Sequence, residues 1–224
     1  MKQAFVRARR PEHKRQRREA ILAAARDLAL ESGVRNVSLG GVAAAVGLAK
    51  SNIVRYFGTR EEIFLELAAE GWTEWGAAVA ERLREAHGTE AMVAVLAETL
   101  VERPLFCDLL SQTTTTLEHN VSVPAARAFK RTVLEVMAEL GRAIVRAHGD
   151  LTEQEGYEIA GAAAALAGTL YPAANPPPTL VELYAQDPEI AATCLPFVPT
   201  LTRALRALAA GLPALRGDDD EARG

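Results

Sequence analysis

The sequence predicts an all-α protein in which a small N-terminal domain precedes a larger helical one. Apolar residues recur at a period near 3.6 through most of the chain, and no segment shows the strict alternation of a half-buried strand. With 224 residues, 49% of them hydrophobic, the chain is long enough to bury a large core. Residues 1–60 contain 13 Lys or Arg and four acidic residues (net +9), whereas the other 164 contain 12 basic and 25 acidic residues (net −13). This division of charge indicates that the basic N-terminal part binds a polyanion and that the rest of the chain is an acidic domain.

The first helix is expected over residues 14–32. Ile21, Ala25 and Leu28 lie on one face at helical spacing, and Gly33 can take the left-handed conformation that ends a helix. Residues 1–13 are expected to form a flexible basic arm. The basic residues of this arm and of the start of the helix are Arg7, Arg9, Arg10, Lys14, Arg15, Arg17 and Arg18. We expect them to add unspecific attraction to phosphates, with insertion into a minor groove as the alternative.

Residues 38–57 have the pattern of a helix-turn-helix. Short helices are expected over 39–45 and 49–56, and Gly47 between them allows a tight turn. Ser38 is placed to cap the first of these helices with its hydroxyl. We therefore expect a three-helix domain over residues 14–59.

The second short helix has the side chains that base recognition requires. Lys50, Ser51 and Asn52 supply polar groups at its N-terminal end, from which they could reach base edges in a major groove. Ile53 and Phe57 are apolar and are expected to face the core. The pattern therefore indicates a DNA-reading helix.

A helical domain is expected over residues 60–212, followed by a flexible tail over 213–224. Thr59 and Glu62 have the spacing of a capping box that begins a helix reaching about residue 84, and Thr152 and Glu155 form a second one. The remaining helices are expected over 89–102, 105–119, 123–147, 153–171, 179–186 and 197–210. Consecutive prolines at 176–178 interrupt the helical pattern.

Residues 17–66 resemble the tetracycline-repressor (TetR) family of bacterial transcription regulators. The resemblance rests on a first helix with the sequence REAILAAARDLALESG, the helix-turn-helix after it, and the segment YFGTREEIF that leads into the fourth helix. It implies a helical ligand-binding and dimerisation domain after the DNA-binding domain. It also implies a homodimer that represses from a palindromic double-stranded operator and releases it when an unknown small-molecule effector binds. A TetR-like activator, and a ligand-binding protein of this fold without specific DNA binding, are the alternatives.

The resemblance also suggests which side chains contact DNA. Lys50, Ser51 and Asn52 are the candidates for base readout, because Lys favours guanine acceptors and Asn pairs with adenine. The candidates for phosphate contact are Ser38, Arg55, Tyr56, Thr59 and Arg60. The alternatives are that Ser38 serves only as a helix cap, that Tyr56 packs in the core and that Arg55 is a solvated surface charge.

One position departs from the family pattern. Val54 stands where the family usually has a tyrosine that touches the DNA backbone. Because valine cannot form a hydrogen bond, Arg55 and Tyr56 are expected to carry more of the phosphate contact.

The dimer interface is expected on the last two long helices. Gly161, Ala165 and Gly168 give helix 153–171 a small-residue face, and helix 197–210 has a stripe of apolar residues. The alternative is that both faces belong to the core of one chain.

Candidate pocket residues are spread over several of the expected helices. Apolar walls with a few polar groups are typical of ligand sites. The candidates are Trp72, Trp75, Phe106, Thr113, His119, Phe129, Met137 and Tyr157. The alternative is that the aromatic and methionine residues are ordinary core.

Several other classes of protein are disfavoured. The histidines form no recognisable catalytic or metal-ligating arrangement, so neither an enzyme nor a cofactor or metal site is expected. The chain has neither a membrane-spanning stretch nor a secretory signal, and its basic N-terminus lacks the large apolar residues of a membrane anchor. Cys107 and Cys194 suit free thiols in a reducing cytoplasm, where we expect this protein.

Overall fold

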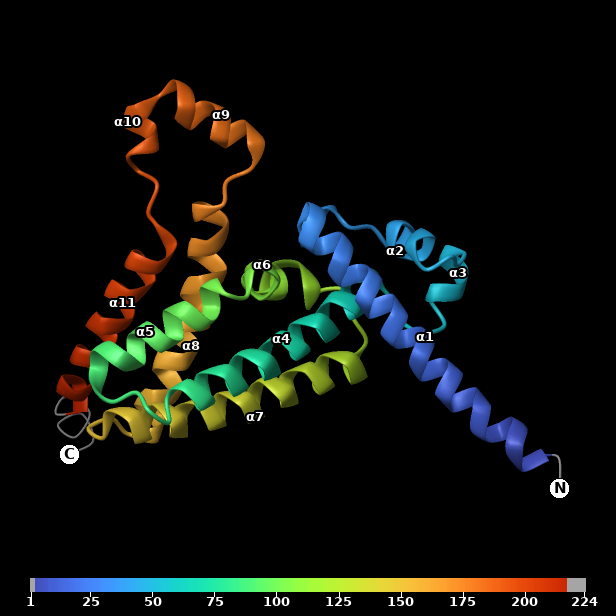
Figure 1. The fold of residues 1–224 in the computed structure, drawn as a ribbon, viewed down its shortest axis with the longest axis horizontal. Helices are drawn as coiled ribbons and strands as arrows, with labels where there is room; N and C mark the ends of the chain where they lie inside the picture. Colours follow the sequence, from blue (N-terminus) through green and yellow to red (C-terminus); the bar gives the residue numbers. More distant parts are fainter. Residues whose placement is uncertain (1–2, 217–224) are drawn as a thin grey trace.

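The computed structural model describes the backbone of residues 3–216 and the side chains from residue 12 onward. All regular structure in this range is helical, which confirms the expected all-α class. The α-helices are α1 (Gln3–Ser32), α2 (Leu39–Ala45), α3 (Lys50–Ile53), α4 (Arg60–Arg82), α5 (Gly88–Val101), α6 (Pro104–Gln112), α7 (Val123–His148), α8 (Glu153–Ala174), α9 (Pro178–Gln186), α10 (Pro188–Ala191) and α11 (Phe197–Gly211). Figure 1 shows α1, α2 and α3 at one end of the molecule and the other long helices in the body.

The body is built around α4, α7 and α8. Helices α4 and α7 lie side by side, while α8 packs on α6, α7 and α11 (Figure 1). At the crossing of α7 and α8 the two backbones nearly touch, because a Cβ atom on Gly156 would lie 2.6 Å from the carbonyl oxygen of Gly141. The absence of side chains at these two positions therefore sets the distance between the helices.

An aromatic cluster joins α4, α5 and α6. The ring centroid of Trp72 lies 5.5 Å from those of Trp75 and Phe106, in edge-to-face arrangements that aromatic rings prefer. The indole Nε1 of fully buried Trp75 donates a hydrogen bond to Thr99 Oγ1 over 3.0 Å. Gly71 makes room for the ring, since a Cβ there would lie 2.4 Å from Phe106 Cδ2. The cluster therefore anchors α6 to the middle of α4.

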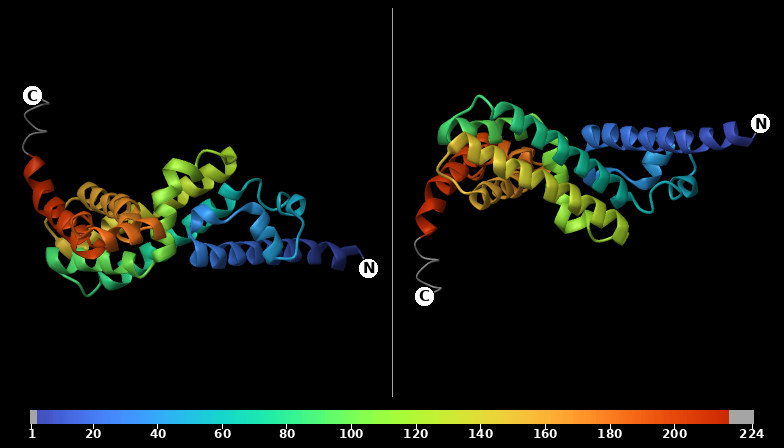
Figure 2. Two further views of the ribbon diagram at one scale, coloured as in Figure 1. Left: turned by 90° about the horizontal axis from the view of Figure 1, so that it is seen from above. Right: turned by 90° about the horizontal axis from the view of Figure 1, so that it is seen from below.

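Several helix boundaries differ from the sequence prediction, and α10 was not expected. Helix α1 begins at Gln3, so the expected flexible arm is helical from that residue, and Figure 2 shows α1 projecting beyond the other helices. Periodicity misses this part because residues 12–17 are all exposed and show no apolar stripe. Helix α3 ends at Ile53, short of the expected residue 56, and the tail adds a 3₁₀ turn over Leu212–Leu215. The rest of the arm and tail, residues 1–2 and 217–224, lies outside the described residues.

The helix expected over 105–119 also ends early, at Gln112. A π-helical turn, Thr113–Leu117, follows it. Three of its four threonines are exposed, and β-branched residues favour α-helix weakly. The buried Thr113 hydroxyl donates to the carbonyl oxygen of Leu109 over 2.7 Å and so bonds the start of the π-helical turn to the last turn of α6.

The small residues expected to form one face of α8 point to different neighbours. Gly168 faces the backbone of Leu110 in α6, and Gly161 faces Met137 in α7, whereas Ala165 is exposed. On α11, Leu201 and Leu205 are fully buried within the chain. Gly161 and Gly168 are therefore packing sites for α7 and α6, and Leu201 and Leu205 belong to the core of the chain, whereas the dimer interface expected on these helices stays a prediction.

Candidate nucleic-acid interface

The helix-turn-helix is held by a cap, a glycine turn and two buried side chains. Ser38 Oγ accepts a hydrogen bond from Gly41 N over 3.0 Å and so caps α2, which confirms the expected capping role. Gly47 has φ of 65°, a conformation that favours glycine, and turns the chain from α2 toward α3. Ile53 and Phe57 are buried as expected, so the opposite side of α3 faces outward.

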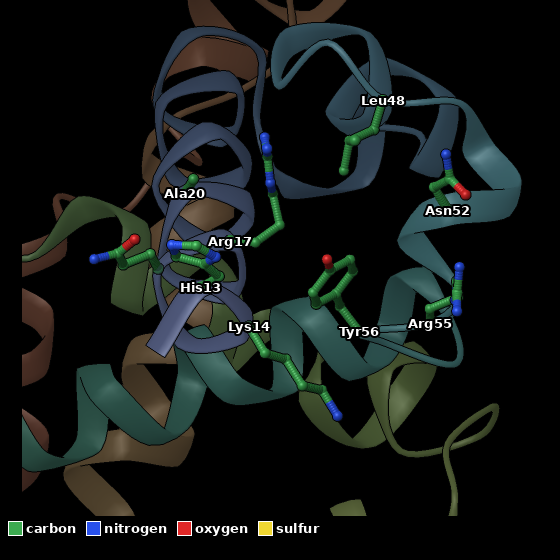
Figure 3. A pocket seen from close by; sticks show the side chains of 9 residues that line it. His13, Lys14, Arg17, Ala20, Leu48, Asn52, Arg55 and Tyr56 are labelled. Carbon is green, nitrogen blue, oxygen red and sulfur yellow. The ribbon is translucent and has the colours of Figure 1, made fainter. Parts of the chain in front are cut away.

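An open basic cleft lies between α1 and α3. Figure 3 shows the side chains of α1 on one side of it and those of α3 and of the turns before and after it on the other. Its lining consists of His13, Lys14, Gln16, Arg17, Ala20, Leu48, Asn52, Arg55 and Tyr56. Three of these residues carry a positive charge and none carries a carboxylate, so the cleft attracts an anionic chain.

The base-readout candidates lie on the exposed side of α3. Lys50, Ser51 and Asn52 are all exposed, and Asn52 also lines the cleft. Val54, which follows them, is 50% exposed and leaves an apolar spot where the family usually has a tyrosine. Arg55 and Tyr56, the expected substitutes for that tyrosine, both line the cleft.

Arg18, which the sequence grouped with the basic arm, has a structural role. Its guanidinium lies 3.9 Å from the centre of the Phe57 ring and donates to the carbonyl oxygen of Tyr56 over 2.7 Å. It also forms an ion pair with Glu66 of α4 through both carboxylate oxygens. Arg18 therefore connects α1, the turn after α3 and α4, and these partners accept hydrogen bonds from three of the five N–H groups of its guanidinium.

Arg60 and Thr59 are likewise occupied by partners within the chain. The guanidinium of Arg60 donates to the carbonyl oxygens of Val34 and Val37 and lies over the Phe64 ring, and its side chain is only 16% exposed. Thr59 Oγ1 donates to the carbonyl oxygen of Asn120 over 2.7 Å and caps α4 by accepting from Glu62 N. Both residues therefore support the domain, and the phosphate contacts expected of them stay predictions.

The first expected capping box is only half formed, whereas the second is complete. The Glu62 carboxylate accepts from Gly58 N and from Ser122 N at the start of α7. Burial raises its pKa, but these hydrogen bonds outweigh burial and the pKa is lowered. Thr152 and Glu155 exchange both bonds of a capping box. Through these two bonds Glu62 of α4 connects Gly58, in the loop after α3, with Ser122 at the start of α7.

The DNA-binding end is also bonded to α6. The Asp108 carboxylate accepts a hydrogen bond from the backbone N–H of Val34 over 2.7 Å. Val34 follows α1 and leads to α2, so this bond spans from the body to the segment that positions the helix-turn-helix. Arg26 of α1 forms an ion pair with Glu70 of α4 on the same side.

The candidate pocket residues do not enclose one cavity. Trp72, Trp75, Phe106, Thr113, Phe129 and Met137 are buried, whereas His119 is exposed and Tyr157 is 37% exposed. His119 bonds locally to the carbonyl oxygen of Thr114, and the two tryptophans are packed in the aromatic cluster. Most of these residues therefore belong to the core and do not line a common cavity.

A cavity of about 200 Å³ opens between α1, α4 and α6, beside that cluster. Its floor includes Leu67, Gly71 and Phe106, and its rim includes Glu70 and Arg26. Burial, together with nearby carboxylates, raises the pKa of Glu70 against the opposing effect of Arg26. Phe106 is thus the one pocket candidate that lines this cavity, which borders both the DNA-binding end and the body.

Sequence reasoning missed several residues of the site. His13 and Gln16 line the cleft, but nothing in a helical stretch without an apolar face distinguishes them from solvated residues. Asp108 was missed because its partner is a backbone N–H 74 positions away, and such a bond has no signature in the sequence. For Arg18 a signal existed, since it directly precedes the apolar periodicity of α1.

Both parts of the chain match models of known protein families. Residues 21–67 match the family model of bacterial regulatory proteins of the tetR family, and residues 69–216 match that of the tetracyclin repressor-like C-terminal domain. No curated protein sequence matches the chain. None of the helices in the described part of the chain is both long and apolar enough to cross a membrane.

Solved structures share the fold at low sequence identity. FadR of Thermus thermophilus, a TetR-family transcriptional repressor solved in complex with lauroyl-CoA, is 17% identical with a TM-score of 0.57, over 87% of this chain and 94% of that one. The fatty acid degradation regulator FadR of Bacillus halodurans is 15% identical with a TM-score of 0.55, over 87% and 95%. FadR of Bacillus subtilis, solved in complex with stearoyl-CoA, is 15% identical with a TM-score of 0.55, over 86% and 98%.

Proposed function

Because this chain belongs to the tetracycline-repressor family of bacterial regulators, we propose that it is a repressor that binds a palindromic operator as a two-fold dimer and leaves it when a small molecule binds. The observation that carries the proposal is the cleft between α1 and α3, which Lys14, Arg17 and Arg55 line together with Asn52 and without any carboxylate. Cationic side chains along such a cleft neutralise phosphates, and the exposed residues of α3 read bases.

Two copies are needed for specific reading. The recognition helix has four residues, so one copy presents only Lys50, Ser51 and Asn52 to base edges. A two-fold dimer doubles that number and requires a palindromic site. The outer faces of α8 and α11 carry small exposed residues, Ala165, Ala207 and Ala210, which allow another pair of helices to approach closely.

The effector is proposed to bind at the cavity between α1, α4 and α6. Its apolar floor and its charged rim of Arg26 and Glu70 suit an amphipathic molecule, and it borders the bond between Asp108 and the DNA-binding end. Lauroyl-CoA and stearoyl-CoA, found in the structures of relatives, are the first molecules to test. The cavity is smaller than the roughly 300–1,000 Å³ usual for such sites, so an acyl chain of that length must widen it.

Selection from random duplexes tests the proposal. We expect the wild type to enrich a palindromic motif, and the double variant Lys50→Ala, Asn52→Ala to lose it, because each base contact is worth about 1–3 kcal/mol. Lys130→Ala, which removes an exposed lysine from α7, is the control and should enrich the same motif. Weak binding that is uniform across sequences would refute specific operator recognition. A reporter gene behind the enriched site then distinguishes repression from activation.

A further inference from the structure

The segment between α8 and α11 stands clear of the body. We call residues 175–196 the α9–α10 arm; Figure 1 shows it beyond the ends of α8 and α11. Within residues 178–191 no side chain is buried. Its exposed large apolar side chains, with their exposed fractions, are Leu180 (37%), Val181 (54%), Leu183 (37%), Ile190 (40%) and Leu195 (55%). So many apolar residues on one short segment indicate a surface that another molecule covers.

The arm is an ordered structure with stiff connections. Prolines at 176–178 and Pro196 fix the backbone at its two ends. Asp187 caps α10 by accepting hydrogen bonds from Glu189 N and Ile190 N, both over 3.1 Å. Helices α9 and α10 pack against each other. A partner therefore meets a preformed surface and need not order a flexible loop.

Charge identifies the partner surface. The arm contains Glu182, Asp187 and Glu189 and no basic residue. Helix α11 contains Arg203 and Arg206 and no acidic residue; Arg206 pairs with Glu90 of α5, so Arg203 is the cation that we assign to the partner. Within one chain α11 runs away from the arm along α8 (Figure 1), so the opposite charges are separated along its length. A second copy related by a two-fold axis can bring the acidic arm of each chain onto the basic α11 of the other.

We propose that the α9–α10 arm packs on the α8–α11 face of a second copy and so extends the dimer interface. The proposal rests on the dimer of the proposed function. It adds to that dimer a contact between the arm of one chain and the α8–α11 face of the other. In a two-fold dimer the apolar residues of both arms become buried, so the contact is made twice. Arg203, which is exposed, is placed to meet the acidic residues of the partner's arm.

Sedimentation velocity of matched variants tests the apolar part. The double variant Val181→Ser, Leu195→Ser changes the arm, and Val101→Ser, Leu134→Ser changes residues exposed to a similar degree (43% and 58%) elsewhere. We expect the arm variant to raise the Kd of dimerisation about tenfold or more, since burial of one such side chain is worth more than a factor of ten. The control variant should keep the wild-type Kd.

A charge swap tests the partner surface and guards against misfolding. Glu182→Arg with Glu189→Arg should weaken the dimer about tenfold, and adding Arg203→Glu should restore most of the loss, because opposite charges then face each other again. An unchanged Kd in both arm variants, with a wild-type dimer present, would overturn the arm contact and leave the proposed dimer intact. A wild type that stays monomeric at every concentration, and on operator DNA, would overturn the dimer of the proposed function itself. A weakened effector response at unchanged Kd would place the arm over the ligand cavity and overturn the proposal.

Discussion

Replacing Gly156 by alanine tests whether the close crossing of α7 and α8 supports the body. The new Cβ would lie 2.6 Å from the carbonyl oxygen of Gly141, whereas ordinary contacts begin at 3.4 Å. The two helices must therefore separate by about 0.8 Å, the difference of these distances. Both groups in contact are backbone, so no change of rotamer relieves the overlap.

The magnitude follows from two opposing effects. Overpacking of a well-packed site raises the free energy of the folded state by about 1–3 kcal/mol, and a clash between backbones belongs at the upper end of that range. Alanine in place of a helical glycine recovers about 1 kcal/mol. We expect a net destabilisation of about 2 kcal/mol, which lowers the Tm by roughly 4–8 °C for a chain of this size.

Gly161→Ala in the same helix is the matched control. Its Cβ would lie 3.4 Å from the flexible Met137 Cε, so the clash is absent and the gain in helix propensity remains. We expect a stability equal to the wild type or higher by up to about 1 kcal/mol. Both variants should be unfolded by heat and by urea at one protein concentration, because dimerisation makes the Tm depend on concentration. Equal effects of the two substitutions would refute the reasoning.

Arg60→Ala should destabilise the fold by about 2 kcal/mol, because it removes the guanidinium donor to the Val37 carbonyl and one of two donors to the Val34 carbonyl, yet keep the salt dependence of DNA binding. Arg55→Ala should instead reduce the salt slope by about one unit. The same reduction for both would show that Arg60 also contacts a phosphate. The Arg216 hydrogen bond lowers the pKa of Glu155 to about 2, so its stabilisation is present above pH 4.5 and lost as the pH falls toward 2. Urea unfolding at several pH values should show this loss for the wild type and a flatter profile for Glu155→Gln; parallel profiles would contradict it. Burial raises the pKa of the Cys107 thiol to about 12, whereas Cys194 is partly exposed, so a thiol reagent at pH 8 should modify only Cys194 in the native protein and both after denaturation. Rapid modification of both in the native state would refute the burial of Cys107.

The sequence was sufficient for features that depend on local chemistry. Ser38, Gly47 and Thr152 were placed correctly because a cap or a turn depends on residues within four positions of it. The inward orientation of Ile53 and Phe57 followed from periodicity alone. These features define the helix-turn-helix, which is why its presence could be predicted.

Features that depend on packing between distant helices could not be predicted. Arg60 reads as a surface cation in sequence, yet its partners are carbonyls 23 and 26 positions away. Trp72 and Trp75 have the composition of a pocket wall, but Phe106 fills the space beside them. In both cases the contacting residues come from another segment of the chain. Periodicity predicts which face of a helix is buried, but not which residues pack against that face.

These long-range bonds determine how the body can act on the DNA-binding end. Three polar side chains hold the segment around η1 (Val34–Asn36) and the turn after α3: Arg18 from α1, Arg60 from α4 and Asp108 from α6. All three helices line the cavity, but of these three residues only Asp108 is directly followed by a lining residue, Leu109. A ligand that pushes α6 outward therefore pulls directly on Val34 N–H, while Arg18 keeps α3 attached to α4. The expected result is a rotation of α1 to α3 as one unit, which changes the separation of the two recognition helices of a dimer without unfolding either.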